Sequence, residues 1–210
     1  MNLEKILLRS AALEEELLRF FDHNKVSSSA RHQTTYTMCS IAFEHAKSAR
    51  ILMEVGNFTS AIGMTRLQYE ALVRAVWVFH AASERLISKL SEELTPESEK
   101  AASKMPMLSQ MLTEIEKSAP RRAYEMLNEI KSQSWKAMNS YTHSGIHAVS
   151  RCKEGYPLVL LINCVKHSNN MSSLAAILYA ILTSNNQIAF VLDKVQSEFG
   201  DCIQLEKPSQ

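Results

Sequence analysis

Residues that interrupt helices are rare in this chain of 210 amino acids, which contains 5 glycines and 5 prolines. An average protein has roughly 12% of these two residues, more than twice as many. β-Sandwiches and barrels need many tight turns, which depend on glycine and proline. A hydrophobic fraction of 46% with 21% charged residues supports a large core and excludes intrinsic disorder. The sequence therefore predicts long helices and an all-α fold.

Apolar periodicity and helix-ending residues predict an antiparallel helical bundle of about five to seven helices. We expect a single domain over 1–200 with a C-terminal tail at 201–210. The expected helices cover 3–22, 30–55, 58–90, 107–117 and 120–143, then one begins at Pro157 and a last one, after a capping box at 184–187, ends near Phe199. The helix after Pro157 is apolar on most sides, so it should be central. Residues 92–105 are expected to be a polar connection, with a helix start at Thr95-Pro96, and 148–156 a loop.

Charge and cysteine content exclude several classes of protein. The net charge of +1 gives no reason to expect broad binding to nucleic acid or to anionic membranes. The longest apolar run is about half of a bilayer span, and the N-terminus lacks the apolar core of a signal peptide. The four cysteines have no paired spacing, and glycine-rich nucleotide loops are absent. We expect a soluble cytoplasmic protein with no membrane segment and no cofactor.

The first segment with chemical potential lies in the helix expected over 58–90. Arg66, Glu70 and Arg74 are spaced by four residues, so they should form successive ion pairs on one helix face. Trp77 adjoins that face, which places the charges at the margin of the apolar stripe. This pattern is typical of a solvated ion-pair ladder, and it also suits polar groups that face a groove or a partner chain.

The second segment is 135–147, at the end of the helix expected over 120–143. His143 is a candidate general acid or base near neutral pH. Lys136 and Asn139 precede it on roughly the same face, where Lys136 could stabilise negative charge and Asn139 or Tyr141 could position a phosphate. Gly145 should end or kink the helix and permit a close backbone approach. A histidine here also suits a purely structural role at a helix C-terminus.

A metal site is the alternative reading of the same segment. His143 and His147 have the i, i+4 spacing that presents two ligands to one ion on a helix. A third ligand would have to come from His45, His80 or Glu70. The resulting protein would resemble the DinB-like four-helix bundles.

These two segments together resemble the HEPN superfamily, the helical bundles of bacterial defence and toxin–antitoxin systems. The matching residues are Arg66, Glu70, Arg74 and Trp77, then Trp135, Asn139, Tyr141, Thr142, His143 and Gly145. The resemblance implies a homodimer with a composite groove and metal-independent cleavage of RNA. His143 matches the family histidine, but the arginine that precedes it by four to six residues in the family is missing, and Lys136 is the nearest cation.

Two functional hypotheses follow from this resemblance. The first is an RNA-engaging homodimer, acting as an endoribonuclease in bacterial defence or with an antitoxin partner. In it His143 would transfer protons, Lys136 and Arg74 would stabilise charge on the phosphate, and Glu70 would hold Arg74. The second is a non-catalytic helical module, a degenerate member of the superfamily, that binds a protein partner or a ligand.

Overall fold

The computed structural model describes residues 2–19, 26–102, 105–183 and 188–203. All regular structure in these ranges is helical, which confirms the predicted all-α class, but there are ten helices rather than five to seven. None of the described helices is long and apolar enough to cross a membrane. The helices are α1 (Leu3–Arg19), α2 (Ala30–Glu54), α3 (Phe58–His80), α4 (Glu84–Ser91), α5 (Pro96–Ala102), α6 (Leu108–Ser118), α7 (Arg121–Thr142), α8 (Ile146–Glu154), α9 (Leu158–Leu182) and α10 (Ile188–Phe199).

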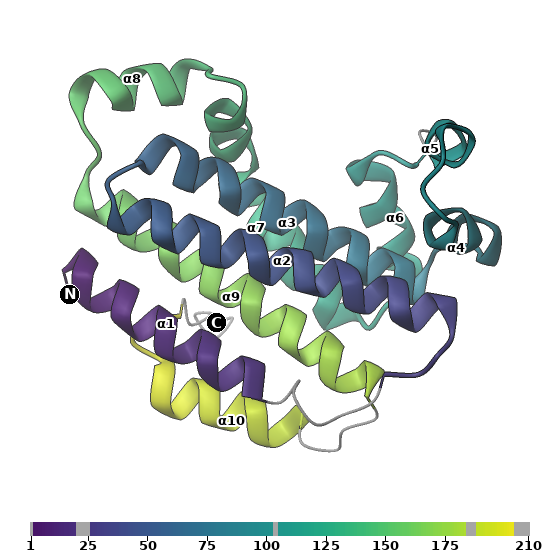
Figure 1. Ribbon diagram of the computed structural model, residues 1–210. Helices are drawn as coiled ribbons and strands as arrows, with labels where there is room; N and C mark the ends of the chain where they lie inside the picture. The colour runs from purple at the N-terminus through teal and green to yellow at the C-terminus, as the bar shows by residue number, and fades with distance from the viewer. Residues whose placement is uncertain (1, 20–25, 103–104, 184–187, 204–210) are drawn as a thin grey trace.

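The core surrounds a hairpin formed by α2 and α3, whose turn contains Gly56 in the left-handed region at φ 78°. Helix α9 packs along this hairpin, and α1 and α10 cover the other side of α9 (Figure 1). The prediction that the helix after Pro157 is central holds for its interior, where Leu161, Val165 and Met171 are buried. Its first turn instead projects into solvent. Leu158 is 49% exposed and Val159 is 69% exposed.

The single helix expected over 58–90 is wrong, because α3 ends at His80 and α4 begins at Glu84. The cause lies in α2. The guanidinium of Arg31 donates to the carbonyls of Phe79 (3.3 Å) and Ala82 (2.8 Å) and to the Glu84 carboxylate (2.6 Å). Free carbonyls at a helix end must find donors, and here a distant side chain supplies them without glycine or proline.

The loop expected over 148–156 is also wrong, because most of it belongs to α8. The polar connection at 92–105 contains α5, whose start at Pro96 confirms the predicted helix start. The Thr95 amide donates to the Ser98 hydroxyl at 2.9 Å, and the Ser98 amide donates to the Thr95 hydroxyl at 3.1 Å. The capping box at 184–187 and the predicted end of the first helix at 20–22 lie outside the described residues.

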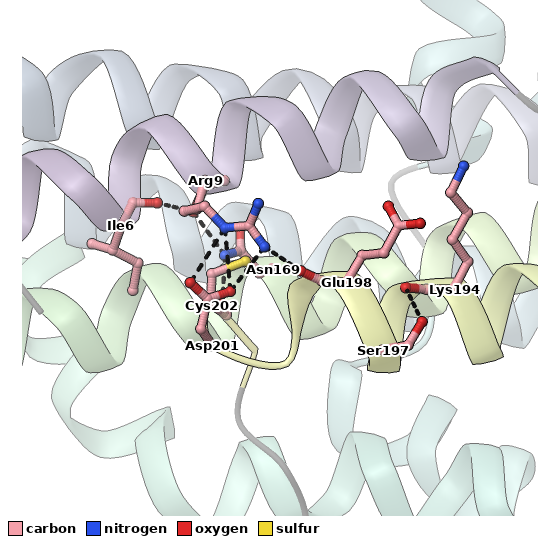
Figure 2. A network of polar contacts seen from close by, with 9 residues as sticks. Ile6, Arg9, Asn169, Lys194, Ser197, Glu198, Asp201 and Cys202 are labelled. Carbon is pink, nitrogen blue, oxygen red and sulfur yellow. Dashed lines mark hydrogen bonds and ion pairs between the residues drawn. The ribbon is translucent and has the colours of Figure 1, made fainter.

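The C-terminal tail expected from residue 201 is docked at its beginning rather than frayed. Arg9 of α1 forms an ion pair with Asp201 at 3.1 Å and donates to the Glu198 carbonyl (Figure 2). Its guanidinium also lies 4.7 Å from the centre of the Phe199 ring. Asn169 of α9 donates to the Cys202 carbonyl at 2.7 Å. We call these contacts the α1 latch, because they fasten the end of the chain to its first helix.

The α1 latch should weaken in acid. Arg9 lowers the pKa of the Asp201 carboxyl, mainly through their hydrogen bond. Because the pKa of Asp201 is lower in the folded protein than its unfolded value of 3.8, the ion pair stabilises the folded state at any pH above 3.8. This stabilisation is lost as the pH falls through the pKa of Asp201 in the folded protein. Because the Asp201 side chain is 43% exposed, we expect Asp201→Asn to cost at most about 1 kcal/mol at pH 7. Urea unfolding of both proteins at pH 7 and pH 3 should show this difference shrink at pH 3. An equal difference at both pH values would contradict the assignment.

Candidate functional site

The ion-pair ladder predicted on α3 is present. Glu70 accepts from Arg66 at 2.6 Å and from Arg74 at 3.1 Å. The guanidinium of Arg66 also lies over the ring of Trp135 on α7, 4.4 Å from the ring centre. Cation–π contacts of this kind favour tryptophan. The ladder therefore ties α3 to the second predicted segment, although it was recognised only as a feature of one helix.

Trp77 lies in the interior, so its own side chain is not on a surface that could bind a ligand. Its side chain is fully buried, and its indole N–H donates to the Glu114 carboxylate of α6 at 2.6 Å. Helices α2, α6, α7 and α9 all pack on α3, so most faces of α3 are interior. Trp77 is a core residue that fastens α6 to α3.

The junction between α7 and α8 forms a tight corner. Ser144 has φ 53° and is the only non-glycine residue with a positive φ in the described ranges. The Gly145 amide then donates to the Ser140 carbonyl at 2.6 Å, which is the long bond of a Schellman motif. A Cβ atom at Gly145 would lie 2.7 Å from the Ser140 hydroxyl and 3.3 Å from its Cα. The predicted helix end and close approach at Gly145 are confirmed, and the approaching group is the preceding helix itself.

An aromatic cluster supports this corner. The His147 ring is stacked on buried Tyr141 with centres 6.4 Å apart, and Tyr156 packs on Tyr141 at 6.5 Å. The Tyr156 hydroxyl is hydrogen-bonded to Thr59, and its ring contacts Phe58 at the start of α3. Burial raises the pKa of Tyr141, while the positive charge of Arg151 acts in the opposite direction. Tyr141 thus shapes the corner from inside, and His147 lies on its outer side.

His143 lies at the C-terminal end of α7, exposed to solvent. Its amide donates to the Asn139 carbonyl at 3.2 Å, and the Asn139 side chain is partly buried. Lys136 is exposed two turns earlier on the same helix, about 10 Å along the axis. The predicted trio of His143, Lys136 and Asn139 therefore shares one helix end.

Arg74 is not brought to this corner. Helix α7 runs opposite to α3, since Trp135 meets Arg66 whereas the end of α7 meets Thr59 through Tyr156. Arg74 lies about four turns from Thr59, or about 22 Å along α3. Within one chain, the ladder and His143 occupy separate places.

Of the cations near His143 in sequence, Lys136 was predicted as a site residue, whereas Arg151 and Lys153 were not. The segment 130–153 contains Lys131, Lys136, Arg151 and Lys153 with two histidines, and no aspartate or glutamate. None of these four cations has a carboxylate partner among the described residues, in contrast to Arg9, Arg31, Arg50, Arg66 and Arg74, which are all paired. We call Lys136, His143, His147, Arg151 and Lys153 the basic corner. The sequence signal for these cations is the absence of aspartate and glutamate over 130–153. The net charge of the whole chain, +1, does not reveal this local excess of positive charge.

The metal-binding alternative lacks a ligand set. Across the described ranges, no three side chains of histidine, cysteine, aspartate or glutamate come together as a metal site would require. His45 and His80 lie on α2 and α3, and Glu70 is engaged by two arginines. His143 and His147 are therefore better described as exposed imidazoles of the basic corner than as ligands.

The fold and the corner define an all-helical protein in which cations without a carboxylate partner among the described residues lie on α7 and α8, the two helices that meet at an exposed histidine. A family model described as "Family of unknown function (DUF6988)" matches residues 39–205, and the chain belongs to this family. The match begins within α2 and includes the ladder and the basic corner. Searches of the curated proteins and of the solved structures give no match.

Proposed function

We propose that this protein binds RNA through the basic corner and cleaves it without a metal ion. The observation that carries the proposal is the surface of unpaired cations around exposed His143. Phosphate contacts by unpaired lysine and arginine supply most of the sequence-independent affinity for nucleic acid. A carboxylate beside these cations would neutralise the surface, and 130–153 contains none.

The chemistry we assign to His143 is proton transfer during attack of a ribose 2′-hydroxyl on the adjacent phosphate. The 2′-oxygen bonds to phosphorus, the 5′-oxygen of the next nucleotide leaves, and the products carry a 2′,3′-cyclic phosphate and a 5′-hydroxyl. Imidazole accepts the 2′ proton or delivers a proton to the leaving oxygen. Lys136 contributes positive charge on the same helix, although a lysine lacks the planar fork of arginine.

We further propose that the active form is a homodimer, because Arg74 of the same chain lies too far from His143 to act there, about 22 Å along α3 from the residue that meets the end of α7. Two exposed apolar residues of α8 adjoin the basic corner, Ile146 at 79% and Val149 at 58% exposed. A second copy packed there would cover these side chains. It would also bring a second set of cations, Arg74 included, toward His143. The bacterial defence or toxin–antitoxin setting and an antitoxin partner belong to this same proposal.

The test is RNA cleavage in EDTA by the folded protein and by His143→Ala. Losing a general acid or base costs roughly 10²–10⁴-fold in rate, so we expect cleavage to fall by that factor while RNA binding changes little. His32→Ala is the matched control, because His32 lies at the start of α2, at the other end of the molecule from α8 (Figure 1). We expect this control to cleave at the original rate.

RNA binding without cleavage by either protein would overturn the catalytic role and leave the binding role. The absence of both would favour the second candidate, a helical module for a protein partner. The exposed apolar side chains beside the basic corner support that candidate, and they would then form its contact surface.

A further inference from the structure

A polar cavity lies at the junction of α1, α2, α3 and α9, apart from the basic corner. It encloses about 410 Å³, including the part open to solvent. One side is apolar, formed by residues such as Leu13 and Met53, and the other is polar. The polar lining residues are Ser10, Glu14, Arg50, Thr65, Ser168, Asn169 and Ser172.

The floor of the cavity interrupts an otherwise apolar helix. Ser168 and Ser172 of α9 are buried, and Gln68 of α3 donates both to the Ser168 carbonyl at 2.9 Å and to the Ser172 hydroxyl at 3.2 Å. The Ser172 hydroxyl accepts that bond, and its own proton has no acceptor within the part of the chain that the structure describes. Buried hydroxyls are costly unless they are hydrogen-bonded. Ser172 therefore offers an uncommitted donor to the cavity.

An ion pair closes the mouth of the cavity. Arg50 of α2 contacts Glu14 of α1 at 3.1 Å, and the two side chains are only 16% and 14% exposed. Glu54 lies further away, 3.9 Å from the Arg50 guanidinium. A largely buried pair is often no more stabilising than apolar residues of the same size. Stability alone thus gives little reason to keep an arginine at this place.

We propose that this cavity binds a small oxyanion, a carboxylate or phosphate of few heavy atoms, on Arg50 and the Ser172 hydroxyl. The guanidinium fork matches both groups in geometry. In the structure the Glu14 carboxylate stands where the ligand's anionic group would bind, so it acts as an internal competitor. A change of Glu14 rotamer opens the site, while Leu13 and Leu17 keep α1 anchored in the core.

The experiment compares the original protein with Glu14→Gln, Asp201→Asn and the double variant Glu14→Gln/Arg50→Gln. The probe is inorganic phosphate, titrated calorimetrically and in thermal unfolding against sodium chloride of equal ionic strength. Asp201→Asn is the matched control, because it also frees an α1-associated arginine, Arg9, but away from the cavity. It corrects for the general stabilisation of folded proteins by phosphate, which is excluded from their surface, and for nonspecific contact of phosphate with an unpaired arginine.

Removing the competitor should tighten phosphate binding at least tenfold over the original protein. At a phosphate concentration ten times the dissociation constant, Tm should rise by about 3 °C in Glu14→Gln, and by clearly less in Asp201→Asn and the double variant. Equal behaviour of Glu14→Gln and Asp201→Asn would overturn the proposal. Should Glu14→Gln not fold, Glu14→Asp shortens the competitor by one carbon and should still bind phosphate more tightly than the original protein. If Glu14→Asp and the original protein bound phosphate with equal affinity, the proposal would be overturned as well.

Discussion

Replacing Trp77 by alanine is expected to lower the free energy of unfolding by about 3–5 kcal/mol, the range for a large aromatic residue removed from a core. The side chain is fully buried, and it lies near the C-terminal end of α3, the helix on which α2, α6, α7 and α9 pack. The substitution also leaves Glu114 without the indole donor. Urea unfolding followed by circular dichroism measures the effect.

Trp77→Phe separates the two contributions. Phenylalanine retains most of the apolar contact but has no N–H. The loss in free energy of unfolding for Trp77→Phe therefore reports mainly the lost hydrogen bond and the reduced volume. Glu114→Ala, alone and combined with Trp77→Phe, completes a double-mutant cycle, because alanine removes the acceptor that glutamine would keep. We expect a coupling of about 1.5–3 kcal/mol, as for a hydrogen bond to a charged group. A cost below about 1 kcal/mol for Trp77→Ala would contradict the core position of this residue.

We expect a triple variant that neutralises the basic corner to bind RNA more weakly and with a weaker dependence on salt. The variant combines Lys136→Gln, Arg151→Gln and Lys153→Gln. For single strands, each lost phosphate contact reduces the slope of log affinity against log salt by about 0.7. Three contacts therefore predict a slope shallower by about 2. Binding of a fluorescent single-stranded RNA at several salt concentrations measures it.

The matched control removes the same charge elsewhere. Lys47, Arg85 and Lys117 are exposed and have no carboxylate partner in the described part of the chain, yet they lie on α2, α4 and α6. Their triple glutamine variant should keep the original slope within about 0.5. If both triple variants lose affinity equally, binding depends on total charge and the basic corner is not the site.

Much of the helical framework could be predicted because its boundaries carry local signals. Gly56, Pro120 and Pro157 each stand at a helix boundary that the structure confirms. The boundary after His80 has no such signal, because its donor is Arg31, which lies 47 residues from Val78 in sequence. Helix α8 was missed for a related reason, since a short polar segment between two glycines resembles a loop.

The candidate site was predictable in its residues but not in their arrangement. Four-residue spacing correctly paired Arg66, Glu70 and Arg74, because helix geometry fixes which side chains meet. Spacing gives only relative directions around the helix, however, and says nothing of which directions other helices cover. Trp77 was therefore placed beside the charged face, whereas it lies in the core. Arg74 was associated with His143, although it lies about 22 Å along α3 from the residue that meets the end of α7.

The α1 latch has a consequence for biosynthesis. Helix α1 is synthesised before α9, which covers much of the apolar face formed by Ile6, Leu13 and Leu17. Arg9 can pair with Asp201 only after the 192 residues that separate them in sequence have been added. Translation adds about 5–20 residues per second. The apolar face of α1 therefore stays uncovered for many seconds, while α2 and α3, which are adjacent in sequence, can already pack on each other. The packing of α1 is thus completed after that of the α2–α3 hairpin, and removal of the segment that contains Asp201 would leave Arg9 without its ion pair.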